Sequence, residues 1–262
     1  MTLLALAVAG RGLVDPDEPV FFADDEAVVR GTAAFDTVRI RGGRAVMLDR
    51  HVERLVRSAQ ALRLPAPDGA RELALQAVAV AGVDEGALRL YRTSRSLVAA
   101  VAPLPSGLDE LRTAGLALVT VQVNAHTALT GIKSTSYGIN MAAVAEAESR
   151  GAADALFLGE DGTVLEATTA NVWWRNGDEL TTPALSTGVL PGVTRAAVAE
   201  LARESGFHVR EGSYPLSDLL EAGEAFVSSA IREIVPVVSV DGQAVARGDA
   251  ASRLQELLEA VA

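Results

Sequence analysis

Strand-like and helix-like patterns of apolar positions follow one another through the first half of the chain. Residues 35–48 form two β-rich runs joined by Arg41-Gly42-Gly43-Arg44, which predicts a hairpin. Residues 48–64 place apolar side chains at helical spacing, so we expect an amphipathic helix that ends before Pro65. The other elements expected here are strands at 2–8, 19–23, 86–94 and 96–104, and helices at 24–34 and about 69–82.

The second half continues the mixture after a turn-rich stretch at 106–114, where we expect a domain boundary. Residues 137–151 and 190–206 predict helices that end at Gly151 and Gly206. The remaining expected elements are strands at 116–123, 153–159, 163–168, 170–183, 208–214, 224–230 and 234–242, and a terminal helix. The pattern predicts an α+β fold with a small N-terminal α+β domain (1–114) and a larger C-terminal α+β domain (115–262).

Composition and charge narrow the classes of partner. Of the 262 residues, 49% are apolar, which is enough for a full globular core, and the formal net charge of −11 argues against nucleic acid. There are no cysteines and the three histidines stand far apart, so we expect no metal. The apolar start lacks the basic segment of a signal peptide and is shorter than the ~20 residues of a membrane span. We therefore expect a first strand there, and a cytoplasmic protein that does not bind a membrane.

Lys133 is the first candidate for chemistry. Of the 23 lysine and arginine residues, it is the only lysine. A single lysine is often a surface residue with no special task. The alternative is a task that arginine cannot perform, because a guanidinium keeps its proton at neutral pH, whereas a desolvated lysine can lose its proton and condense with an aldehyde.

Two further segments carry polar groups for which a structural and a chemical role are both open. Glu166 ends a predicted strand, and it is either a solvated loop charge or a carboxylate that keeps a heterocyclic nitrogen protonated. Pro191 and Gly192 shape a turn into a helix with free N–H groups and the hydroxyl of Thr194, which is either a plain helix start or a phosphate site. Together with the lysine, these groups predict pyridoxal 5'-phosphate as the cofactor.

Five separated blocks fall in one order between about residues 18 and 243: HVERLVRSAQAL, GIKSTSYGINMAAVAEAESRGAADALFL, GTVLEATTANVWW, STGVLPGVTR and SSAIREIVPVVSVDG. This succession resembles the class IV aminotransferases, the fold-type IV pyridoxal-phosphate enzymes. The resemblance implies a two-lobed α+β fold, with the cofactor in the cleft between the lobes, and a homodimer.

The resemblance also implies a role for each matching position. Lys133, in the larger domain, would be the Schiff-base lysine and the catalytic residue that moves a proton at the substrate carbon. Glu166 would pair with the pyridine nitrogen, and Arg54 would reach the phosphate from the small lobe. The other implied cofactor contacts are Leu190 beneath the ring, Val193 and Thr194 at the helix start, and Ser229, Ala230 and Ile231. Some relatives carry threonine where Ala230 or Ile231 stands.

Within the family, RGTAAFDTVRI, GALRLYRTSRS, IKSTSY and SSAIREIVPV look closest to 4-amino-4-deoxychorismate lyases. The resemblance thus implies a lyase of folate biosynthesis that releases pyruvate and forms 4-aminobenzoate. An aminotransferase for branched-chain or D-amino acids is the alternative, because the same cofactor residues serve both reactions. Gly31-Thr32-Ala33 departs from the G-D-G turn common in these relatives, and we expect this change to alter the substrate pocket.

The implied substrate is a small amine with one or more carboxylates, so its site needs cationic anchors. Arg30, Arg92 and Arg95 are the candidates, although each could be an ordinary surface arginine, and Tyr137 is a candidate partner of the cofactor ring or the substrate. A non-catalytic binding protein of the same fold is a separate hypothesis, which the presence of both the lysine and the glutamate opposes. A third hypothesis is an enzyme of this fold that acts on an unusual substrate.

Overall fold

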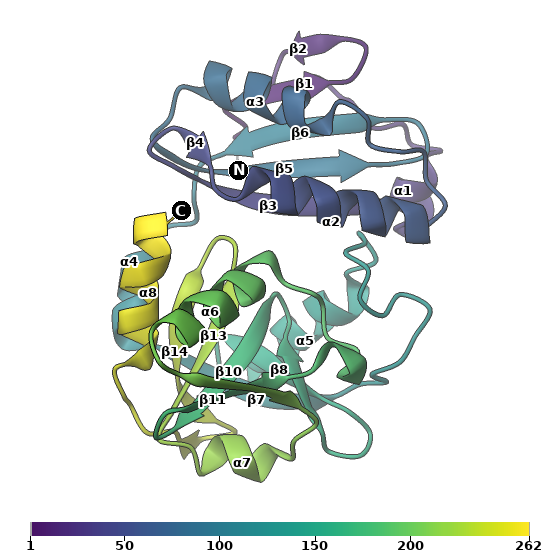
Figure 1. The fold of residues 1–262 in the computed structure, drawn as a ribbon. Coiled ribbons are helices and arrows are strands. Elements are labelled where there is room, and N and C mark those ends of the chain that lie inside the picture. The colour runs from purple at the N-terminus through teal and green to yellow at the C-terminus, as the bar shows by residue number, and fades with distance from the viewer. Residues whose placement is uncertain (1, 262) are drawn as a thin grey trace. The chain divides into compact units, whose positions relative to one another are not determined.

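This computed structural model describes residues 2–261 of the chain. These residues form two β-sheets and the helices that pack on them (Figure 1). By their contacts, the residues divide into two units. The first contains the chain up to Ser106 together with Ile132–Tyr137, and the second contains Gly107–Gly131 and Gly138–Val261. The expected mixture of helices and strands in two lobes is confirmed. Within the described residues, no helix is both long enough and apolar enough to span a membrane.

The first unit is built on an antiparallel six-stranded sheet with the order β2-β1-β6-β5-β3-β4. Helices α2 and α3 pack on one face of this sheet, and their apolar side chains form one core with it (Figure 1). The elements are β1 (Ala5–Val8), β2 (Gly12–Val14), α1 (Glu26–Arg30), β3 (Ala34–Arg41), β4 (Arg44–Ala45), α2 (Leu48–Ala61), α3 (Ala70–Ala81), β5 (Glu85–Arg92) and β6 (Leu97–Ala102).

Both faces of strand β1 are buried, which explains why its sequence is a continuous apolar run. Ala5 and Ala7 belong to the core under the helices, whereas Leu6 and Val8 belong to a second cluster with residues of β6. Successive side chains of a strand point to opposite faces of the sheet, so a strand that is covered on both faces needs apolar residues throughout.

The second unit contains a nine-stranded sheet that closes on itself. Strand β9 pairs with both β8 and β10, so β10-β13-β14-β7-β8-β9 form a ring around an apolar core. Closure leaves these six strands without a free edge. The elements are α4 (Leu108–Ala114), β7 (Leu116–Gln122), α5 (Gly138–Ser149), β8 (Asp154–Leu158), β9 (Val164–Ala167), β10 (Ala170–Asn176), β11 (Glu179–Pro183), a 3-10 turn η1 (Leu185–Thr187), α6 (Val193–Glu204), β12 (His208–Gly212), α7 (Leu216–Leu220), β13 (Glu224–Ser229), β14 (Glu233–Val240), β15 (Gln243–Ala244) and α8 (Ala250–Val261).

Two local predictions were wrong, and a third, the short helix expected at 24–34, was correct in place but too long. Residues 19–23 form no strand, because β1 pairs with β2 instead and Val20 only packs against the apolar cluster beside β1. The helix expected at 24–34 covers only Glu26–Arg30, since Gly31 adopts a left-handed conformation and ends it. The turn-rich residues 106–114 include helix α4, which packs its Leu111 against the core of the second unit.

The segment around Lys133 lies with the first unit, although we expected the lysine in the domain that begins at residue 115. The N–H of Phe35 donates to the carbonyl of Lys133 at 3.0 Å, and the N–H of Thr135 donates to that of Ala33 at 2.9 Å. These bonds extend the backbone pairing of β3 to a segment that lies 98 or more residues further along the chain. The boundary between residues 114 and 115 stays a prediction.

Candidate active site

The amine of Lys133 is held by aromatic side chains of its own unit. Lys133 is 9% exposed, and its Nζ donates to the Tyr137 hydroxyl at 3.1 Å and lies 4.6 Å from the centre of the Phe35 ring. Its backbone N–H donates to the Ser58 hydroxyl of helix α2 at 3.2 Å. Within residues 2–261, no carboxylate forms an ion pair with Nζ. The single lysine is therefore a buried amine that is not neutralised by an acid, and it is not a surface residue.

Arg54 projects from α2 into a buried charge cluster with Asp36 and His51. Its Nε and Nη2 donate to the Asp36 carboxylate at 2.9 and 2.8 Å, and Nδ1 of His51 lies 2.7 Å from the same carboxylate. Burial alone would raise the pKa of Asp36, but the charge of Arg54 and the hydrogen bonds from His51 and Arg54 bring this pKa well below its usual value. The cluster fixes the direction of the guanidinium, because two donors bind one carboxylate.

Asp36 and His51 are residues that the sequence analysis missed. His51 and Arg54 are three apart on one helix, so they share a face, and Asp36 lies on the strand beneath. A helix with histidine and arginine three residues apart, next to an acidic residue in a buried strand, is the signal that could have identified the cluster.

The carboxylate of Glu166 is held by uncharged donors in the second unit. The amide of Asn171 donates to its Oε2 at 2.9 Å, and the N–H of Leu190 lies 3.1 and 3.2 Å from its two oxygens. The same Asn171 amide donates to the carbonyl of Leu190 at 3.0 Å. Glu166 is thus an ordered, half-buried carboxylate at the end of β9, and not a solvated loop charge.

Asn171 was also missed by the sequence analysis. It is opposite Glu166 in the β9–β10 pairing and opposite Ser228 in the β10–β13 pairing, so it connects three strands. The short turn of ATTAN between two apolar runs indicates the hairpin, and a hairpin register of this kind places Asn171 across from Glu166.

Helix α6 starts next to Glu166 with its first turn uncapped by any side chain. Gly192 is the N-cap residue, and a Cβ at this position would lie 2.1 Å from Oδ1 of Asn171. Only glycine lets the chain pass so close to Asn171 and enter the helix. Val193 and Thr194 are buried in the first turn, where backbone N–H groups and the helix dipole favour an anion.

The turn between β13 and β14 lies at the same end of the sheet. Ser228 pairs with Asn171, so the half-buried Ser229, Ala230 and Ile231 follow directly after the strand position beside it. The second unit therefore brings Glu166, Leu190, the start of α6 and this turn together around Asn171, while their contacts with a cofactor stay a prediction.

Each of the three arginines that we expected to anchor substrate contacts another group of the protein. Arg30 is exposed and pairs with Glu26 on its own helix, at 2.9 Å. Nε of Arg92 donates to the carbonyl of Pro65 at 2.7 Å, and burial lowers the pKa of Arg92. Arg95 pairs with Asp24 at 2.7 Å and lies over the Phe22 ring. Their binding of substrate carboxylates stays a prediction.

The turn that departs from the G-D-G pattern is bonded to the lysine segment. The carbonyl of Gly31 accepts hydrogen bonds from the hydroxyls of Thr135 and Ser136, at 2.8 and 3.1 Å. A Cβ on Gly31 would meet Ser136 Oγ at 3.0 Å, and its φ of +70° favours glycine. Gly31 is therefore fixed by this contact, whereas Thr32 is the position at which the chain differs.

The chemistry of these donors fits pyridoxal phosphate. The cofactor needs an amine for its aldehyde, a carboxylate for its pyridine nitrogen and cationic or N–H groups for its phosphate. The first unit supplies the buried amine of Lys133 and the guanidinium of Arg54. The second supplies an oriented carboxylate and a helix start where Gly192 leaves no room for a Cβ.

Residues 33–240 match the family model for amino-transferase class IV, and the chain belongs to this family. It is a pyridoxal-phosphate enzyme of a family that acts on amines and keto acids, and the predicted fold and cofactor are confirmed.

Two curated relatives match over most of their length. The chain is 31% identical to the bifunctional aminodeoxychorismate lyase / D-amino acid transaminase of Mycobacterium tuberculosis, over 95% of both chains. It is 29% identical to the aminodeoxychorismate lyase of Bacillus subtilis, over 95% of this chain and 92% of the relative. A solved structure described as a hypothetical aminotransferase from Mycobacterium tuberculosis, in its PLP-bound form, is 29% identical and superposes with a TM-score of 0.90 over 98% of both chains.

Proposed function

We propose that this protein is a 4-amino-4-deoxychorismate lyase, which releases pyruvate and forms 4-aminobenzoate. The observation that carries the proposal is the similarity, over nearly the whole chain, to two relatives named for this activity. The name of the first relative also includes D-amino acid transaminase, so transamination of a D-amino acid is the second candidate. A branched-chain aminotransferase is a further alternative, since a putative enzyme of that kind is 28% identical to this chain.

In this proposal, Lys133 is the catalytic residue. Its amine would hold the cofactor through the aldehyde carbon and, once the substrate amine has displaced it, would take the proton from the substrate carbon that carries the amine. The cofactor, when bound, supplies an electron sink for the charge left on that carbon. In the lyase, loss of this proton accompanies departure of pyruvate and leaves an aromatic ring. The Tyr137 hydroxyl orients Nζ, and the Phe35 ring shields it from water.

The remaining residues bind and orient the cofactor. Glu166 would accept a hydrogen bond from the pyridine nitrogen, while Asn171 and the Leu190 N–H hold the carboxylate in place. The N–H groups and hydroxyls at the start of α6 (Val193, Thr194) and in the β13–β14 turn (Ser229, Ala230, Ile231) would bind the phosphate, and Leu190 would contact the ring. Arg54 would be a further phosphate ligand, as the resemblance implies. Arg54 is suited to this task because Asp36 fixes its direction.

We further propose that the enzyme is a cytoplasmic homodimer whose substrate carboxylates bind Arg30, Arg92 or Arg95. Size-exclusion chromatography with light scattering should give twice the mass of 27.2 kDa. Single Arg→Gln variants should raise KM for the substrate if the arginine binds it. An unchanged KM would remove that arginine from the site.

Assays of the purified protein with two sets of substrates test the function. With 4-amino-4-deoxychorismate alone, we expect pyruvate and 4-aminobenzoate in equal amounts. Amine transfer from D-alanine or leucine to 2-oxoglutarate, without pyruvate release from aminodeoxychorismate, would overturn the lyase proposal in favour of a transaminase. Lys133→Arg is the control, because it keeps the positive charge and cannot carry out either reaction. A wild-type protein that takes up no cofactor would favour the non-catalytic alternative.

A further inference from the structure

The turn between β13 and β14 has an unusual construction. Ser229 pairs with Glu233 across a three-residue loop, Ala230 to Arg232, and Glu233 has a φ of +56°. Such loops end in a left-handed residue, and glycine is common there because other residues are strained in this conformation. A buried glutamate in this position means that other contacts hold the turn in shape.

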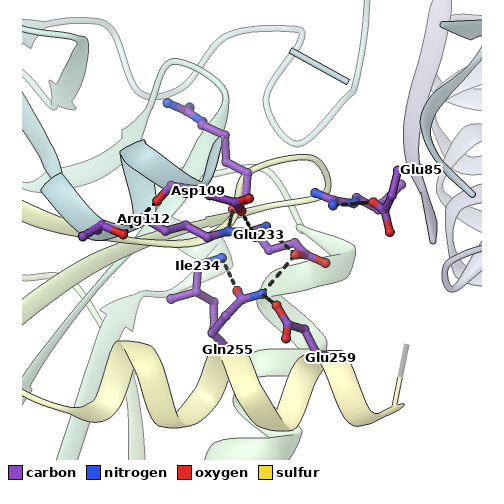
Figure 2. A network of polar contacts seen from close by, with 10 residues as sticks. Glu85, Asp109, Arg112, Glu233, Ile234, Gln255 and Glu259 are labelled. Atoms are coloured by element: carbon purple, nitrogen blue, oxygen red, sulfur yellow. Dashed lines mark hydrogen bonds and ion pairs between the residues drawn. The ribbon is translucent and has the colours of Figure 1, made fainter. Parts of the chain in front are cut away.

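One set of contacts holds Glu233 itself (Figure 2). Nη2 of Arg112 donates to Oε2 of Glu233 at 2.6 Å, and Nε2 of Gln255 donates to the same oxygen at 3.0 Å. The N–H of Ile234 donates back to Oε1 of Gln255 at 3.0 Å, and Nε of Arg112 donates to the carbonyl of Arg232 at 3.3 Å. This network fixes the C-terminal side of the turn.

A second set of contacts is made by the neighbouring Arg232, which binds residues of β8 and of the β9–β10 turn. Nη2 of Arg232 donates to Oδ2 of Asp154 at 2.8 Å and to the hydroxyl of Thr169 at 2.6 Å. Asp154 begins β8 with a side chain only 3% exposed, and its other oxygen accepts from the Thr168 hydroxyl at 2.5 Å. Arg232 thereby joins the β13–β14 turn to the β9–β10 turn and to β8.

The ion pair between Arg232 and Asp154 lies next to residues that we assign to the cofactor site. Thr168 and Thr169 form the turn that directly follows the strand of Glu166, and Ala230 and Ile231 directly precede Arg232. We propose that Arg232 is a positioning residue, which holds the N–H groups of Ala230 and Ile231 in the orientation that binds the cofactor phosphate. This inference rests on the proposed function, in which this turn contacts the phosphate.

The test compares pyridoxal phosphate with pyridoxal, which lacks the phosphate. In Arg232→Gln, the dissociation constant of pyridoxal phosphate, from absorbance titration of the cofactor-free protein, is expected to rise about tenfold, because a charge-assisted hydrogen bond is lost. The dissociation constant of pyridoxal should change less than about twofold. Arg150→Gln is the control, since Arg150 forms a more exposed ion pair of similar length with Asp241, in the β14–β15 turn at the other end of β14. It should change neither constant.

Two further measurements distinguish a local effect on the turn from a general loss of structure. Thr169→Val removes only one exposed hydroxyl, and it should weaken pyridoxal phosphate by a smaller factor in the same direction. Amide hydrogen exchange of residues 229–233 in the cofactor-free protein should increase in Arg232→Gln and not in Arg150→Gln. Equal weakening of pyridoxal and pyridoxal phosphate, or no weakening of either, would overturn the inference. Failure of the wild-type protein to bind either compound would instead refute the proposed function.

Discussion

Replacing Asp36 with asparagine would remove one negative charge from the centre of a buried cluster. Its carboxylate accepts two hydrogen bonds from Arg54, and the side chains of Asp36, Arg54 and His51 are 0, 5 and 2% exposed. Asparagine has the same shape but only one acceptor oxygen, and its amide group would face the N–H donors of Arg54. The variant leaves a buried guanidinium without this carboxylate.

The expected cost follows from that burial. Removing one partner of a buried ion pair costs roughly 3–5 kcal/mol, because the remaining charge stays away from water. Solvent does not screen this cluster, so we expect Asp36→Asn to lower the free energy of unfolding by about this amount at pH 7. Asp49→Asn is the matched control, since Asp49 pairs with Arg71 on the surface, with 72 and 51% of their side chains exposed. Solvent weakens such a pair, and we expect almost no loss.

Urea denaturation of the cofactor-free protein, followed by circular dichroism, measures the difference. Tryptophan fluorescence alone would not report unfolding of the first unit, which contains Asp36, because both tryptophans lie in the second unit. The Arg54 charge keeps the folded-state pKa of Asp36 below its unfolded value of 3.8, so the carboxylate stabilises the fold above about pH 4 and loses this effect as the pH falls further. The wild type and Asp36→Asn should therefore converge in acid. A loss at pH 7 no larger than that of Asp49→Asn would refute the reasoning.

Three other substitutions test the remaining parts of the site. Gly192→Ala would place a Cβ 2.1 Å from Asn171, so urea denaturation should show a loss of roughly 1–3 kcal/mol, whereas Gly138→Ala, with open space around it, should show none. Glu166→Gln keeps an acceptor for the Leu190 N–H but loses the charge, so absorbance titration should show pyridoxal phosphate bound about 10- to 100-fold more weakly. An unchanged affinity would argue against its contact with the pyridine nitrogen. Lys133→Arg, treated with borohydride and cofactor, should carry no label in peptide mass spectra. A label retained on an internal peptide of this variant would place the covalent link elsewhere.

Local elements were predictable where the pattern alone decides them. Helix α2 follows from apolar residues at helical spacing, and the β3–β4 hairpin follows from Gly42-Gly43 between two β-rich runs. The strand expected at 19–23 failed, because its apolar residues pack against a sheet without joining it. The apolar pattern predicts that a segment is buried on one face or on both. It does not predict which strand the segment pairs with.

The fold decides which residues surround the candidate groups. Asn171 meets Glu166 through strand register, and Asp36 meets Arg54 because a strand and a helix 18 residues apart pack together. The hairpin turn and the spacing of His51 and Arg54 point to these partners, but the strand register and the packing of helix on strand decide which groups meet.

The amino-acid sequence alone determined which groups are candidates for the chemistry of this protein, since a single lysine among arginines has a chemistry that no arginine can replace. The tertiary structure decided what holds those groups. Backbone pairing with β3 buries the lysine against a phenol and an aromatic ring, and strand register places the Asn171 amide beside the glutamate. The physical reason is that the type of a side chain sets which reaction it can perform, whereas its burial and hydrogen-bond partners depend on segments far away in the chain.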